Sequence, residues 1–210
     1  MPLPLTGQIG PAAGSDGAQL PFRQGRSGEQ VVTELHGRYY ENTYRKNVFT
    51  VYCQAQATTS LTTAACVGLQ LWNGSPLSNG VNLVLLKTGG YISVTTASLT
   101  GLVLASGTGQ STAPTSQTAA TAVKNNFLGG SAPQATAISA GTFSAAPTAH
   151  ISLLHNTAAI ATTGEDAGYL IDLEGSIIVP PQSFVAVNTI GAAGSASAWN
   201  GWLMWEEVPV

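Results

Sequence analysis

The sequence predicts an all-β fold, namely an antiparallel β-sandwich of the jelly-roll type with an extended N-terminal arm. From residue 48 onward, short apolar-rich runs recur at close spacing and are separated by turn-forming pairs such as Asn79-Gly80. About eight such runs can be counted, and that number of short antiparallel strands suits two packed sheets. The chain has 210 residues, a length that a single β-sandwich domain can reach. We therefore expect one sandwich domain over residues 29–210.

The first 28 residues cannot build a core of their own. They contain four prolines and six glycines and show neither the period of a strand nor that of a helix. We expect residues 1–28 to form an extended arm, which is either a disordered leader or a segment that lies along a neighbouring subunit. In the second case its anchors are Leu20, Phe22, Arg23 and Arg26.

Residues 29–46 carry the densest charge in the chain, interleaved with apolar residues and three tyrosines. This mixture predicts an exposed first strand and turn. Charge is common on solvated edge strands, where it prevents stray pairing. The alternative is a surface that meets a partner, and Tyr39 and Tyr40 are then its contact residues.

The strands that we expect next cover residues 48–56, 66–72, 81–87, 91–95 and 102–105. Gly89-Gly90 is short enough to be a hairpin turn between the third and fourth of these. Residues 106–148 form a tract rich in Ser, Thr and Ala, interpreted as an insertion, with a short helix predicted over 118–128. A strand over 148–156 and three closing strands within 169–210 complete the count.

The two cysteines are predicted to be reduced. Cys53 shares a strand face with Phe49 and Val51, whereas Cys66 lies on the face opposite to Leu69 and Leu71. If the two strands are neighbours, the thiols point apart.

The charge pattern excludes several kinds of partner. Charged residues make up only 8% of the chain, and from Asn125 onward there are six acids and no base. Phosphate binding needs clustered Lys or Arg, so a nucleic-acid surface is not expected. No apolar run is long enough for a membrane helix, and no secretory signal precedes the domain, so we expect synthesis in a cytoplasm. The low charge instead suggests a surface that other protein copies cover.

No pattern in the sequence predicts a catalytic, metal or cofactor site. The nucleophile elbow, the zinc-protease motif and the phosphate-binding loop are all missing from the chain. His150 and His155 differ by five positions, so on a strand they face opposite sides and do not share a metal easily. We therefore expect a protein that is not an enzyme.

The final strand presents large side chains on both of its faces. Trp199, Leu203 and Trp205 lie at odd-numbered positions and so on one face of the strand, whereas Trp202 and Met204 lie at even-numbered positions and so on the other. We expect the first set in the core and the second set, Trp202 and Met204, against another subunit. The alternative is that the outer ring stacks on a sugar.

Four stretches stand out beside the arm: 37–41 (GRYYE), 67–73 (VGLQLWN), 175–179 before Pro180-Pro181, and 205–210 (WEEVPV). Together they resemble small jelly-roll virion proteins of tailed bacteriophages. Proteins of that kind decorate or cement the capsid shell, commonly as trimers, and the resemblance implies no catalytic residues.

The resulting prediction is a structural virion protein on the capsid surface that self-associates, as a trimer, and binds the major capsid protein. Two alternatives stay open. One is a head-fibre, tail or receptor-binding component of the virion, and the other is a carbohydrate-binding β-sandwich module.

Overall fold

The computed structural model describes residues 7–8, 22–23, 37–56, 61, 63–94, 101–120, 122–155, 168–189 and 198–210. The chain divides into two compact units, Met1–Glu41 and Asn42–Val210. In the first unit Gly7–Gln8 (β1) pairs in parallel with Phe22–Arg23 (β2). The predicted arm anchors Leu20 and Arg26 lie outside the described residues. A single helix, α1 (Tyr40–Tyr44), is described, and no described helix is long and apolar enough to cross a membrane.

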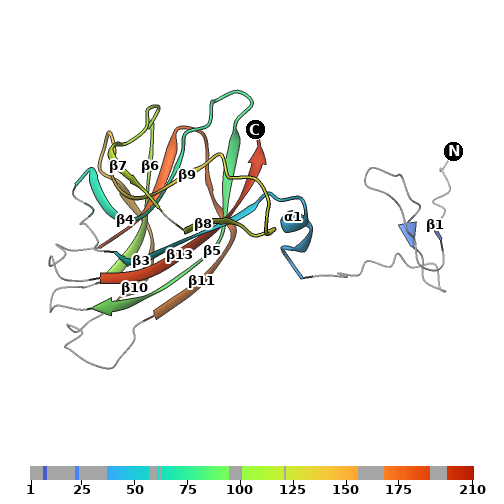
Figure 1. The fold of residues 1–210 in the computed structure, drawn as a ribbon, viewed down its shortest axis with the longest axis horizontal. Coiled ribbons are helices and arrows are strands. Elements are labelled where there is room, and N and C mark those ends of the chain that lie inside the picture. Colours follow the sequence, from blue (N-terminus) through green and yellow to red (C-terminus); the bar gives the residue numbers. More distant parts are fainter. Residues whose placement is uncertain are drawn as a thin grey trace. The chain divides into compact units, whose positions relative to one another are not determined.

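The second unit is a sandwich of two sheets (Figure 1). The five-stranded sheet has the order β11-β5-β13-β3-β8, and the six-stranded sheet has the order β10-β6-β12-β4-β9-β7. The strands of the first are β11 (Gly168–Val179), β5 (Val81–Val94), β13 (Ala198–Pro209), β3 (Val48–Gln56) and β8 (Ala122–Asn125). Those of the second are β10 (Thr148–His155), β6 (Gly101–Thr108), β12 (Ser183–Thr189), β4 (Ala65–Asn73), β9 (Thr136–Thr142) and β7 (Thr115–Ala119).

Eight of these strands follow the jelly-roll winding. Leaving out β7, β8 and β9, consecutive strands alternate between the two sheets, and only the step from β6 to β10 stays within one sheet. The last strand, β13, lies between β3 and β5, and β12 lies between β4 and β6. This arrangement is that of a double-sheet jelly roll, and it confirms the predicted fold class.

The core lies between the sheets and follows from strand parity. Val51 and Leu203 of one sheet and Leu71 and Leu104 of the other belong to one buried cluster. On β13 the predicted inner set, Trp199, Leu203 and Trp205, is fully buried. The ring of Trp205 stacks on that of Phe49 with 5.7 Å between centroids. Trp205 thus joins the first and last strands of the roll through side chains as well as backbone.

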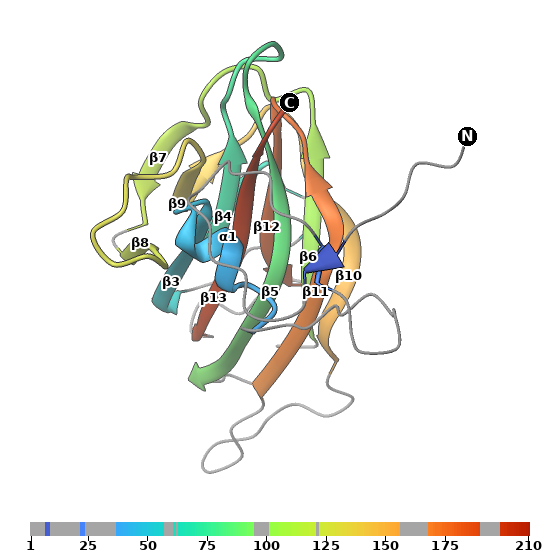
Figure 2. The same cartoon turned by 90° about the vertical axis from the view of Figure 1, so that its right-hand side faces the viewer.

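The Ser/Thr/Ala-rich insertion adds strands to both sheets. Residues 115–119 and 136–142 form β7 and β9, which extend the six-stranded sheet beyond β4, while β8 pairs with β3 (Figure 2). The helix predicted over 118–128 is therefore wrong. Thr and Ala residues there have free sheet edges beside them, and pairing with β3 and β9 satisfies their backbone groups better than an isolated short helix does.

Two further predictions need correction. Gly89-Gly90 is not a hairpin turn, because β5 continues through it and pairs with β13 on one side and β11 on the other. The expected strand within residues 29–46 is replaced at its end by α1, whereas residues 29–36 lie outside the described part of the chain. Lys46, at φ 67°, ends this helix: its N–H donates to Thr43 O, and Asn47 N–H donates to Asn42 O. Such a left-handed cap satisfies the last carbonyls of a helix.

The two cysteines form no disulfide with each other, as predicted, and both are buried. Cys53 lies in the core, whereas Cys66 belongs to a separate cluster with Phe143, Phe184 and Ala186. Burial raises the pKa of the Cys53 thiol to about 11. At neutral pH Cys53 is thus protonated and unreactive.

Candidate binding surface

The outer face of the six-stranded sheet is covered by the chain itself. Phe184 of β12 stacks on Phe143 with 3.7 Å between ring centroids, and both are buried together with Cys66 and Ala186. Residues 109–114 run past Trp72 of β4, whose Nε1–H donates to Gln110 O at 3.0 Å. The Gln110 side chain in turn accepts the Ser144 N–H at 2.7 Å. These contacts make this outer face a second, smaller core.

The outer face of the five-stranded sheet is open. Along four of its five strands, β3, β13, β5 and β11, apolar and aromatic side chains keep much of their surface exposed. Leu170 is 74% exposed, Ile178 55%, Tyr91 44% and Tyr52 38%. Trp202 and Met204, predicted to meet a partner, both lie half-buried on this face. Large apolar side chains gathered on one surface are typical of binding sites.

A hollow of about 380 Å³ lies on the open face near the end of the sheet. It is lined by residues from β3, β5, β11 and β13, and the pairing register explains why they meet. Trp202 is opposite Tyr52 on one side and Gly89 on the other, and Asn200 is opposite Tyr91. The lining residues are Tyr52, Gly90, Tyr91, Tyr169, Leu170, Asn200, Gly201 and Trp202. Four of these eight are aromatic, and none is charged.

The Trp202 ring lies against the backbone of Gly89. A Cβ atom at position 89 would meet the ring atoms Nε1, Cε2 and Cζ2 at 2.8, 2.9 and 2.9 Å. Contacts this short do not occur between real side chains, so only glycine leaves room for the ring in this position. Gly89 therefore sets how Trp202 is presented in the hollow.

The two tyrosines at the rim interact with each other. Burial raises the pKa of Tyr52, and the neighbouring Tyr91, which is hydrogen-bonded to it, raises the pKa further. Tyr169 packs against the core, and its burial raises its pKa to about 12, with a smaller opposing effect from Thr88. The lining contains no Lys, Arg, His, Asp or Glu, and the tyrosine hydroxyls make the rim of the hollow polar.

Charged groups lie on the neighbouring part of the face. Lys87 Nζ and Asp172 Oδ2 form an ion pair of 3.4 Å, and Met204 is opposite Lys87. One row further, Asn42 Nδ2 donates to Glu206 Oε2 at 2.8 Å. Burial raises the pKa of Glu206, and the bond from Asn42 partly offsets this. The open face therefore has an aromatic end around Trp202 and a mixed end around Met204 and Ile178.

Tyr39 and Tyr40, also predicted as contact residues, belong to the first unit. Tyr39 is half-buried under the Arg38 guanidinium, 5.9 Å from its ring centroid, and Tyr40 is exposed. Phe22 and Arg23 form β2. The interface role of all these residues stays a prediction.

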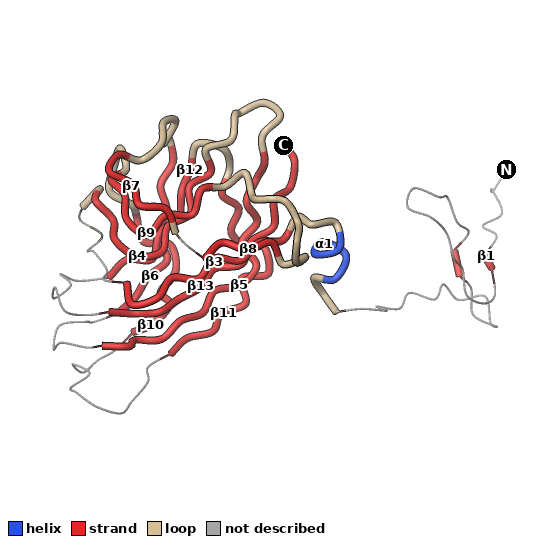
Figure 3. The backbone as a smooth tube through the Cα atoms, in the orientation of Figure 1, coloured by secondary structure: helices blue, strands red, loops and turns tan. Residues whose placement is uncertain are grey.

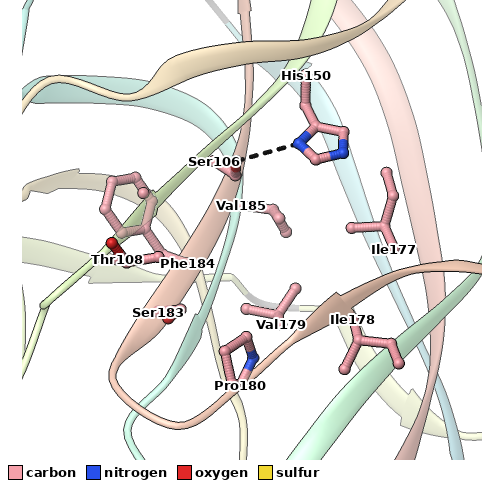
Figure 4. Close-up of a pocket in the computed structure, with 11 residues that line it drawn as sticks. Ser106, Thr108, His150, Ile177, Ile178, Val179, Pro180, Ser183, Phe184 and Val185 are labelled. Carbon is pink, nitrogen blue, oxygen red and sulfur yellow. Dashed lines mark hydrogen bonds between the residues drawn. The ribbon is translucent and has the colours of Figure 1, made fainter.

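A second hollow, of about 190 Å³, contains a serine and a histidine (Figure 4). His150 is the extra residue of a bulge in β10, and its Nδ1 lies 3.4 Å from Ser106 Oγ. The remaining lining is mainly apolar, from Ile177 to Pro180 and around Phe184, and none of the lining residues is acidic. A serine nucleophile needs a histidine that is oriented by a third group. No lining residue supplies an acid for that role.

Within the described part of the chain, no three His, Cys, Asp or Glu side chains lie close enough together to hold a metal ion. The acids Asp172 and Glu174 share a strand, but Glu174 lies in a bulge at φ 50°, and its N–H donates to Asp172 Oδ1.

Comparisons with known proteins return no match to a protein-family model, to a curated protein or to a solved structure.

The sequence pointed to Trp202 and Met204 but not to Tyr52, Tyr91, Leu170 or Gly89. Parity alone places Tyr52 on the face of β3 opposite to Val51. Its meeting with Trp202 and Tyr91 depends on the pairing register, which a single sequence does not reveal.

Proposed function

We propose that this protein is a structural, non-enzymatic component of a bacteriophage virion that decorates the capsid. It self-associates, as a trimer, and binds the major capsid protein. The open outer face of the five-stranded sheet is the observation that supports this proposal. A chain with 8% charged residues leaves Leu170 and Ile178 largely exposed there, while it covers its other outer face with its own insertion.

Protein contact fits the mixed end of the open face best. Ile178 and Val208 are exposed, Met204 and Val84 are half-buried, and the ion pair of Lys87 with Asp172 lies beside them. An apolar centre with a polar rim is the usual composition of a protein interface. Anything that binds only the assembled shell stabilises it by mass action, which gives a decoration protein its effect without any chemistry.

A pair of lysine substitutions tests this proposal. Met204→Lys with Ile178→Lys places two charges on the mixed end without touching the core. We expect the wild-type chain to be oligomeric in light scattering and to co-sediment with cognate capsids that lack it. The double variant should be shifted to monomer and should lose co-sedimentation.

Leu128→Lys is the matched control. Leu128 is 86% exposed on the turn of the insertion, away from the open face in the strand order, so it should leave assembly and capsid binding unchanged. A monomeric wild-type chain that binds no capsid would exclude the decoration role. Deletion of residues 1–28 separates the arm from the sheet: a decoration protein that clamps its neighbours with the arm should lose shell binding, whereas a receptor-binding component should keep cell binding.

A further inference from the structure

We propose that the aromatic hollow around Trp202 is a binding site for a neutral saccharide. Its volume of about 380 Å³ lies near the lower end of the range of small-molecule sites, roughly 300–1,000 Å³. A site of this size accepts one or two sugar rings rather than a long segment of protein. Saccharide binding at this hollow does not depend on capsid binding, which we assign to the other end of the same face.

The first argument is the presentation of the Trp202 ring. The indole lies against Gly89, where no side chain intervenes, and Trp202 is also one of the residues that line the hollow. The face of an aromatic ring carries a negative potential. A pyranose offers a flat set of C–H bonds with positive polarisation, which packs against such a ring face and leaves the sugar hydroxyls at the periphery.

The second argument is the polar groups at that periphery. Tyr52, Tyr91 and Asn200 line the same hollow as Trp202, and a phenol or an amide can both donate and accept a hydrogen bond. Sugar hydroxyls also do both. A purely apolar ligand would desolvate these groups without replacing their bonds, which costs free energy.

The third argument is charge. None of the eight lining residues is charged, and the pKa values of Tyr52 and Tyr169 are shifted upward, away from ionisation at neutral pH. Acidic sugars such as sialic or uronic acids need a basic partner, which the lining lacks. The expected ligand is therefore a neutral hexose or N-acetylhexosamine unit.

The test uses the full chain on two sets of immobilised oligosaccharides. One set ends in glucose, galactose, mannose or N-acetylglucosamine, and the other ends in sialic or uronic acid. We expect binding to members of the neutral set. Trp202→Ala should lower the apparent affinity at least tenfold, Trp202→Phe should retain part of it, and Tyr91→Phe should lower it by loss of one hydroxyl.

Leu128→Lys, at an exposed position away from the open face, is the control and should bind sugars as the wild-type chain does. Light scattering and thermal unfolding of each variant show whether assembly and folding persist. Binding of neither set, preference for the acidic set, or equal binding by Trp202→Ala would overturn the proposal. So would binding of a proline-rich decapeptide in place of sugars, since aromatic grooves also recognise that conformation.

Loss of self-association in Trp202→Ala without any sugar binding would also overturn it and would assign the hollow to a subunit contact. Conversely, sugar binding by a chain that fails to bind capsids would reject the decoration role and keep the saccharide site.

Discussion

The two sheets have outer faces of opposite character, although both sheets belong to one jelly roll. On the six-stranded sheet the outward side chains of β12 and β4 are buried under residues 109–114 and Phe143. On the five-stranded sheet Trp202, Tyr91, Leu170 and Ile178 also point outward, and they remain exposed or half-buried. Apolar composition is therefore not what separates core from surface here. What separates them is whether the insertion reaches the face.

The largest effect is expected on the covered face. Phe184→Ala removes a ring that stacks on Phe143 and is almost fully buried, so it should cost about 3–5 kcal/mol of unfolding free energy. Denaturant unfolding measures this cost. A cost as small as that of an exposed residue would mean that the insertion does not hold this face closed.

The insertion is also tied to the five-stranded sheet, through Glu207. Its buried carboxylate accepts the N–H groups of Gln134 and Ala135 at 3.0 and 2.9 Å. Glu207→Ala leaves two amide donors without their acceptor and should cost roughly 2–4 kcal/mol.

Hydrogen exchange of the β9 amides and the fluorescence of Trp72 show whether the insertion that covers β12 and β4 also loosens when Glu207 is replaced. Glu207→Gln keeps one acceptor oxygen and should be intermediate. Destabilisation with an unchanged Trp72 signal would mean that the two ends of the insertion are independent.

On the open face, the larger ring of Trp202 should contribute less to the free energy of unfolding than Phe184 does. Trp202→Ala should cost less, roughly 1–3 kcal/mol, because part of the Trp202 side chain stays exposed in the folded state. Trp205→Ala, three positions along the same strand, should cost about as much as Phe184→Ala, since Trp205 is fully buried. Comparison of their thermal unfolding checks this. Equal costs would show that Trp202 is part of the fold rather than of a binding site.

The smallest effect concerns pH. Because burial raises the pKa of Glu206, the folded state binds its proton more tightly than the unfolded state does. Ionisation of Glu206 therefore opposes folding at neutral pH. Glu206→Gln should raise the melting temperature slightly at pH 7, and the gain should vanish as the pH falls to about 4, the ordinary range of a glutamate.

A gain that persists at low pH would assign the effect to packing instead. Asn42→Ala removes the donor that offsets part of the upward pKa shift of Glu206. In the Asn42→Ala background, Glu206→Gln should therefore raise the melting temperature at pH 7 by more than it does in the wild-type chain.

The parts of the fold that follow local rules could be predicted from the sequence. The alternation of β3 and β13 identified their core faces, including Trp199, Trp205 and Cys53, because strand side chains alternate strictly. The bounds of β3, residues 48–56, also agree with the prediction. The division of Cys53 and Cys66 between two clusters has the same origin.

The parts that depend on distant partners could not be predicted. Gly89-Gly90 is turn-like in isolation and becomes strand only because β11 and β13 pair on either side of it. Thr115–Ala119 has no apolar alternation, and its pairing with β9 makes it a strand. The hollow was missed for the same reason, since it joins residues of four strands whose register is not local information.

The central position of β13 also governs how the chain must be made. This strand, Ala198–Pro209, separates β3 from β5, and without it neither has a neighbour on that side. During synthesis β3 therefore waits for about 150 further residues before its partner has left the ribosome. Such long-range pairing makes folding slow and keeps unpaired strand edges exposed in the meantime. The roll should thus be completed only once β13 has left the ribosome, and a ribosome stalled before residue 198 should carry a nascent chain that proteases still cut within β3 and β5.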